Sequence, residues 1–153
     1  MKKLVFLLTL MATILLPTPV QSDNDARLYT PKPGTQVRKA ICDAMRKYVR
    51  QMQDIDPKIK FLWKIDTMKV LGKYACFEGH AVKPDGSFFE DQSMIGDFVQ
   101  MTFLRRNEDG WWVIADLTRT DVPSKEELKQ IRGTFPAEVP TVIIPDFWKK
   151  KLR

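Results

Sequence analysis

The segment TQVRKAICDAMRKYVRQMQDIDPKIKFLWKID, residues 35–66, changes its hydrophobic period once along its length. Its first half has apolar residues at helical spacing, which predicts an amphipathic helix that begins near Gln36, is capped by Thr35 and stops at residues 54–57. Its second half alternates apolar and charged residues, which predicts a half-buried strand. The apolar positions are Val37, Ile41, Ala44, Tyr48 and Met52 in the helix and Ile59, Phe61, Trp63 and Ile65 in the strand.

Three further strands are expected downstream, over residues 74–82, 98–105 and 111–118. Turn residues separate them, including Gly72-Lys73 and the hairpin loop at residues 107–110. A change of parity at Met68 and Val70 predicts a β-bulge in the first strand. Because short turns join antiparallel neighbours, we predict an α+β fold with one long N-terminal helix packed on a curved four-stranded antiparallel sheet.

The C-terminal third is expected to contain one short helix and an extended tail. Ser124 and Glu127 have the spacing of a capping box, and Gly133 is expected to end the helix that they begin. The proline-rich remainder is predicted to be irregular, with the apolar residues of segment 139–148 lying against the body. The predicted organisation is a signal peptide (1–22), a lead-in (23–34), a single α+β domain (35–148) and a basic tail (149–153).

The N-terminus has the build of a secretory signal peptide. Lys2 and Lys3 precede the apolar run 4–16, and Ser22 supplies a small residue before a cut at Asp23. An uncleaved membrane anchor is the alternative, but the run is shorter than the ~20 residues that span a bilayer. We therefore expect a periplasmic or secreted protein with no stable membrane insertion after cleavage.

The net charge of +6 depends on the two ends of the chain. Residues 23–148 carry equal numbers of basic and acidic side chains, whereas residues 149–153 are almost all basic. A nucleic-acid-binding protein is expected to carry a basic stripe on its folded body, so this distribution argues against nucleic acid as a partner. The tail is expected to be a solvated terminus, with contact to anionic lipid headgroups or to an acidic partner as the alternative.

Cys42 and Cys76 are the only cysteines. In an oxidising compartment they are expected to form a disulfide that joins the helix to the sheet. Two buried free thiols are the alternative. Neither a Cys-x-x-Cys redox motif nor enough histidine for a zinc site accompanies them, so no metal is predicted.

Four short segments carry a resemblance to a known group of folds. They are Ile41-Cys42-Asp43-Ala44 in the helix, the strand-turn-strand from Val70 to Ala75, the hairpin from Leu104 to Ile114, and Thr120-Asp121-Val122-Pro123. With these features the chain resembles small exported bacterial proteins with a cystatin-like roll. The larger cone-shaped version of that roll is found in ketosteroid isomerase and scytalone dehydratase. The resemblance implies a fold and no activity.

No catalytic residue and no cofactor is predicted, and five residues are candidates for contact with a ligand or partner. His80 is the sole histidine and lies on a predicted strand, and Asp116 is the strand carboxylate that a proton-transfer enzyme could place in a cavity. Trp111 and its neighbour Trp112 must point to opposite sheet faces, so one of them faces outward unless segment 139–148 covers it, which is the favoured outcome. The remaining candidates are the adjacent aromatic residues Phe88 and Phe89.

These observations favour an exported, non-enzymatic binding or inhibitory module that is a monomer or weak dimer and takes an unidentified protein or small ligand. The alternative is a small cavity-based lyase or isomerase that uses a buried carboxylate. A filled interior disfavours the enzyme, and a large cavity with a buried carboxylate favours it. A third hypothesis is a secreted protein that contacts a host or competitor cell through its basic tail.

Overall fold

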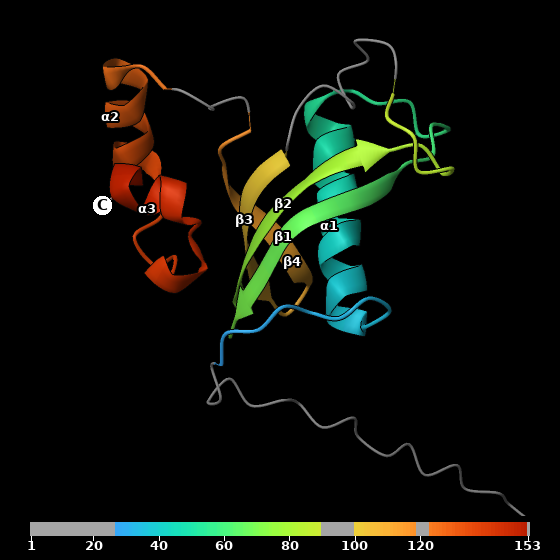
Figure 1. Ribbon diagram of the computed structural model, residues 1–153, viewed down its shortest axis with the longest axis horizontal. Helices are drawn as coiled ribbons and strands as arrows, with labels where there is room; N and C mark the ends of the chain where they lie inside the picture. The colour runs from blue at the N-terminus through green and yellow to red at the C-terminus, as the bar shows by residue number, and fades with distance from the viewer. Residues whose placement is uncertain (1–26, 90–99, 119–122, 153) are drawn as a thin grey trace, which may run out of the picture.

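The computed structural model describes residues 27–89, 100–118 and 123–152 (Figure 1). These residues form an α+β arrangement of a four-stranded antiparallel sheet and three α-helices. The sheet has the order β1-β2-β3-β4, so each strand pairs with its neighbour in the sequence. The strands are β1 (Leu62–Leu71), β2 (Tyr74–Val82), β3 (Gln100–Asn107) and β4 (Gly110–Asp116).

Helix α1 (Gln36–Met52) occupies the range that its apolar period predicts. It buries Ile41, Met45 and Val49, which recur every four residues and therefore lie on one side of the helix. Thr35 holds the N-cap position, but its side chain makes no capping bond and its hydroxyl donates to the Lys32 carbonyl at 2.8 Å instead.

The predicted bulge in β1 is confirmed. Pairing with β2 passes from Ile65↔Gly79 to Thr67↔Glu78 and leaves Asp66 without a partner, so the residues that face α1 change parity there. Gly79 is required at this place, since a Cβ on it would lie 2.6 Å from the Lys64 carbonyl oxygen.

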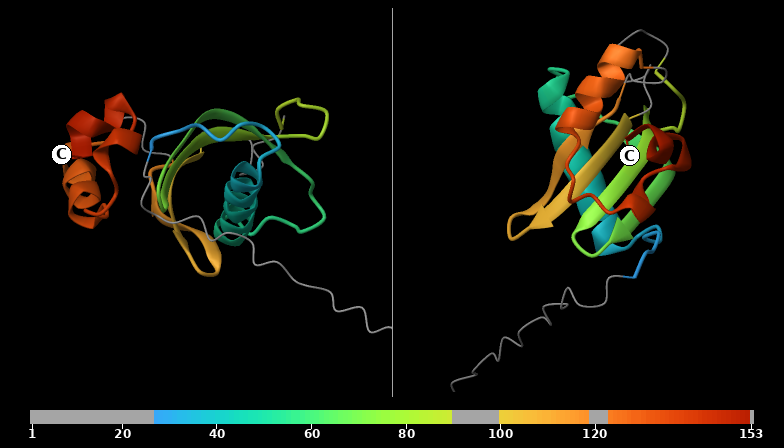
Figure 2. Two further views of the ribbon diagram at one scale, coloured as in Figure 1. Left: turned by 90° about the horizontal axis from the view of Figure 1, so that it is seen from below. Right: turned by 90° about the vertical axis from the view of Figure 1, so that its left-hand side faces the viewer.

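Two hydrophobic cores lie on the two faces of the sheet. The inner core contains the buried side of α1 together with Phe61, Phe77 and Leu104. The outer core contains Phe103 and Met101 of β3 and a set of residues from the C-terminal segment. Figure 2 shows the same arrangement, with α1 inside the curve of the sheet and the C-terminal helices outside it.

Helix α2 (Lys125–Thr134) begins with the predicted capping box. The Glu127 amide donates to Ser124 Oγ at 3.2 Å, and the Ser124 amide donates to Glu127 Oε2 at 2.8 Å. The predicted stop at Gly133 is wrong, because the helix continues through this residue to Thr134. Phe135 follows and packs on Phe103 with their ring centroids 5.1 Å apart, so tertiary packing sets the end of the helix.

The prediction of an irregular C-terminus with a solvated tail is also wrong. A short 3₁₀ helix, η1 (Thr141–Ile143), follows Pro140, and helix α3 (Asp146–Leu152) follows Pro145. Both elements are anchored in the outer core, and even Leu152 is buried. They are too short for a hydrophobic period to be recognised, and the buried apolar surface stabilises them instead. The buried residues of this segment are Val139, Ile143, Ile144, Trp148 and Leu152.

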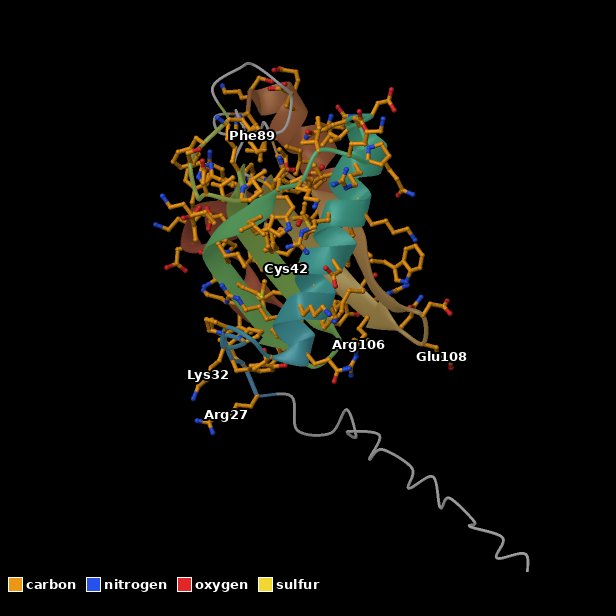
Figure 3. All side chains as sticks on the ribbon, turned by 90° about the vertical axis from the view of Figure 1, so that its right-hand side faces the viewer. Arg27, Lys32, Cys42, Phe89, Arg106 and Glu108 are labelled. Carbon is orange, nitrogen blue, oxygen red and sulfur yellow. The ribbon has the colours of Figure 1, made fainter. Side chains whose placement is uncertain are left out.

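The predicted disulfide is wrong, because Cys42 and Cys76 are both buried free thiols. Cys42 belongs to the inner core, on the α1 side of the sheet, as Figure 3 shows. Cys76 belongs to the outer core, because successive residues of β2 point to opposite faces and Phe77 points inward. The sheet therefore separates the two sulfur atoms.

Within the described residues, no helix has both the length and the apolar character needed to cross a membrane.

Candidate functional site

A groove of about 370 Å³ lies between α1 and β4. Its helical wall is one face of α1, because each lining residue has another three or four positions away along the helix. Two of them, Ala40 and Ala44, have small side chains that leave space opposite the strand. The helical wall consists of Ala40, Asp43, Ala44, Lys47, Tyr48 and Gln51.

The other wall is the start of β4 and the turn before it. Asp109, Gly110 and Val113 line this wall together with the two adjacent tryptophans, Trp111 and Trp112. Arg106 lies over the Trp111 ring, with its Cζ atom 5.9 Å from the ring centroid. The strand therefore supplies a largely aromatic surface opposite the small residues of α1.

The structure assigns opposite roles to the two tryptophans. Trp111, the predicted contact residue, is 8% exposed and belongs to the inner core, whereas Trp112 is 46% exposed. Val113 pairs with Leu104 on the inner face, and the next pair along the two strands is Trp112 with Arg105. Trp112 therefore points to the opposite face of the sheet from Val113. The predicted cover is also absent at this position, since segment 139–148 packs over β3 and β2 rather than over Trp112.

Two contacts fix the Trp112 side chain. Its indole Nε1 donates to Asn107 Oδ1 at 2.9 Å. Lys47 Nζ lies 5.0 Å from the centroid of the ring, a cation–π contact from α1 across to β4. Trp112 is thus exposed but held in place, so less side-chain conformational entropy would be lost when a ligand binds to it.

Asp116 hydrogen-bonds to the helix and is not the buried carboxylate that the enzyme hypothesis requires. The Tyr48 hydroxyl donates to Asp116 Oδ2 at 2.9 Å, and the Thr118 amide donates to Asp116 Oδ1 at 2.8 Å. Burial, and then the bond to this carboxylate, raise the pKa of the Tyr48 phenol well above its ordinary value. Asp116 itself is exposed at the end of β4.

His80 and Phe88 meet at a second place, on β2 and the loop that follows it. Their ring centroids lie 5.7 Å apart, and His80 Nε2 is 3.4 Å from Asp66 Oδ2. Lys64 lies over the Phe88 ring at 5.0 Å. This cluster is separated from the groove by β3, because β2 and β4 are not neighbours in the sheet.

Phe89 takes part in neither place. It packs against the inner core and is partly buried, while Phe88 is 47% exposed. Figure 3 places Phe89 at the opposite end of the molecule from Glu108 in the β3–β4 turn. Of the five predicted contact residues, only Trp111 lines the groove, and only His80 and Phe88 touch each other.

The groove lining and the described interior contain few of the side chains that take part in acid–base or metal chemistry. The lining contains no histidine or cysteine, and the only buried polar side chains among residues 27–89, 100–118 and 123–152 are Gln100 and Thr102. The ionisable groups whose pKa burial raises are the thiols of Cys42 and Cys76, which do not line the groove, and the phenol of Tyr48, which does. Nor does this part of the chain bring together three His, Cys, Asp or Glu side chains that could hold a metal ion.

Sequence reasoning missed the helical half of the groove. Ala44 and Tyr48 belong to the predicted apolar stripe of the helix, which fits their spacing but does not show that they border an open space. The sequence signal for such a groove is an apolar stripe on the helix that is wider than the sheet can cover.

No protein family, known protein or solved structure matches this chain.

Proposed function

We propose that the protein is an exported, non-enzymatic binding or inhibitory module, and that its ligand occupies the groove between α1 and β4. The observation that carries the proposal is the exposed but fixed Trp112 at the border of a 370 Å³ groove with small residues opposite. Binding sites combine such apolar, aromatic surfaces with a few placed polar groups, and Lys47, Tyr48 and Asp109 supply those here.

Export is proposed from the N-terminal sequence. The basic start, the apolar run 4–16 and the small residue before Asp23 support cleavage of a signal peptide and a periplasmic or secreted location. These residues lie outside the part of the chain that the structure describes. We propose an unidentified protein or small molecule as ligand, no nucleic acid, and a monomer or weak dimer.

We also propose that the fold is a cystatin-like roll. The support is the order of elements, one long helix followed by four antiparallel strands, and the inclusion of α1 residues in the core on the inner face of the curved sheet (Figure 2). The outer layer formed by α2, η1 and α3 is an addition to that arrangement.

The experiment is photo-crosslinking in the cells that make the protein. A benzophenone amino acid is placed at Gln51, an exposed residue that lines the groove, and in a second strain at Gln130, an exposed residue of α2. Irradiation is expected to give a defined adduct from position 51 and none from position 130. Matched glutamines on two helices make the comparison independent of the chemistry of the probe.

The adduct from position 51 is also expected to disappear in the Trp112→Ala variant and to persist in Phe147→Ala, which removes a comparably exposed aromatic ring (54%) from α3. Equal adducts from both crosslinker positions, or an adduct that survives Trp112→Ala, would contradict the proposed site.

A further inference from the structure

The two edges of the sheet are protected to different degrees. At the β1 edge, Tyr29 forms a bridge with Val70, with N–H to C=O bonds of 3.0 and 2.8 Å, and the bulge at Asp66 interrupts the strand. Lys64 and Lys69 also lie on β1. Covering segments, bulges and lysines are the devices by which proteins prevent the pairing of an edge strand with another chain.

No described segment, bulge or lysine protects the first half of the β4 edge in this way. Its sequence GWWVIAD contains no lysine or proline, and β3 is its only hydrogen-bonded neighbour in the described sheet. The irregularity in its pairing with β3 lies beyond Val113, so Gly110–Val113 is a regular segment. In an antiparallel edge strand, every second residue directs its N–H and C=O away from the sheet. These groups are available to another extended chain.

The open edge and the groove are formed by the same residues. Gly110, Trp111, Trp112 and Val113 line the groove, and α1 forms its opposite wall. A strand added to β4 would send alternate side chains to the α1 side, where Ala40 and Ala44 leave room. Backbone pairing would then provide affinity, and the groove would select the side chain.

Two exposed carboxylates, Glu108 and Asp109, lie in the β3–β4 turn at one end of the groove, and none of the ion pairs among the described residues includes either of them. The nearby cations already have partners, since Arg106 lies over the Trp111 ring and Lys47 over the Trp112 ring. Asp43 also lines the groove from α1 but already contacts Arg46 at 2.6 Å. A basic side chain on a bound segment would find unpaired carboxylates at this end, whereas an acidic one would be repelled.

We propose that β4 accepts an extended peptide segment of another protein as a fifth strand, with an apolar side chain in the groove and a lysine or arginine beside Glu108 and Asp109. This inference rests on the proposed binding function and names the class of its ligand. A basic-apolar peptide fits the open backbone, the groove and the charge together, whereas a small molecule would use the groove alone.

The first arm of the test identifies peptides. The purified exported protein selects binders from a phage-displayed library of random linear peptides, and the selected sequences are synthesised with a fluorophore. We expect enrichment of extended segments that combine an apolar residue with lysine or arginine. The Kd of these peptides is expected to rise about tenfold or more in Trp112→Ala and in Asp109→Lys, and to stay unchanged in Phe147→Ala.

The second arm tests strand addition directly. Each backbone nitrogen of the best peptide is methylated in turn. Methylation is expected to abolish binding at every second position and to have no effect at the positions between. Amide hydrogen exchange of the protein should slow at residues within Gly110–Val113. The peptide carries the modification, so the result does not depend on whether a proline variant of β4 folds.

The outcomes separate the two proposals. Strand addition would be overturned by peptides that need Trp112 for binding but tolerate every N-methylation and leave the β4 amides unprotected. The groove would then remain the binding site. Self-association through β4, seen as a concentration-dependent dimer that masks the edge, would make a second copy the occupant and overturn the peptide. Failure to select any peptide would overturn it as well. Peptides that bind equally well to Trp112→Ala would contradict both proposals.

Discussion

The two faces of the sheet are covered in different ways. The outer face is covered by the contiguous C-terminal segment, whose apolar residues fill a core around Phe103 and Cys76. The inner face is covered by the single helix α1, and a groove of about 370 Å³ remains between this helix and β4. The hollow on the outer side of β4, beside α2, has only about 200 Å³.

This difference separates the residues expected to determine stability from those expected to take part in the proposed binding. Helix α1 lies against β4 on the inner face, and the small side chains of Ala40 and Ala44 leave a space there. Trp112 has the opposite parity from Trp111 and is not covered by the C-terminal segment, which packs over β2 and β3, so its ring stays exposed beside this space. We therefore expect substitutions on the outer face to change folding and substitutions along the groove to change binding.

The largest effect is expected from Phe103→Ala on the outer face. The Phe103 side chain has no exposed surface and packs edge-on against Phe135, so truncation should lower the free energy of unfolding by about 3–5 kcal/mol. Urea denaturation monitored by circular dichroism measures the loss. Phe147→Ala, at a ring that is 54% exposed, serves as the control and should change stability little. A loss as small as that of the control would mean that the C-terminal segment does not seal this face.

The second-largest effect is expected to be a loss of stability at alkaline pH. The buried thiol of Cys76 in the outer core contributes to this loss. Burial raises the pKa of the Cys76 thiol to about 12 from an ordinary value of 9.0. In the unfolded chain the thiol ionises first, so the contribution of Cys76 to the free energy of unfolding should be constant well below pH 9 and fall as the pH rises from 9 toward 12. Tyr48, whose pKa is also raised, acts in the same direction.

The measurement is a series of urea denaturations between pH 8 and pH 11, with Cys76→Ala as the comparison. The variant should show a shallower decline over this range, although its stability at pH 8 is lower. Because the two thiols are unpaired, a reducing agent should leave the thermal midpoint unchanged. A large decrease on reduction would contradict the arrangement in which the sheet separates Cys42 from Cys76.

The sequence predicted the elements with strong periods and missed those that tertiary packing creates. Helix α1 begins at Gln36 as predicted, strand β2 has the predicted bounds, and the β1 bulge follows from a change of parity. Each of these depends on contacts between residues close in the chain. Helix α3 and the continuation of α2 through Gly133 depend instead on packing with distant strands, which no local pattern records.

The site shows the same division. Alternation predicted that one of two adjacent tryptophans faces the core, but it could not tell which, because that depends on the pairing of β4 with β3. Predicting the groove requires knowledge of the distance between α1 and β4. The predicted cysteine pairing is wrong because neighbouring residues of β2 face opposite cores. Both are properties of the arrangement of elements rather than of any one element.

The smallest expected change in stability comes from Trp112→Ala, and its comparison with Trp111→Ala tests the two roles most sharply. Trp112→Ala removes one hydrogen bond to Asn107 and one contact with Lys47 from a half-exposed ring, so it should cost about 1 kcal/mol or less. Trp111→Ala removes a ring that is 8% exposed from the inner core and should cost about 3–5 kcal/mol. Because the two residues are adjacent and identical, the difference reports their unequal burial together with their different contacts, Asn107 and Lys47 for Trp112 and Arg106 for Trp111. Equal losses in urea denaturation would mean that β4 pairs in another register, and the groove would then lack its exposed aromatic side chain.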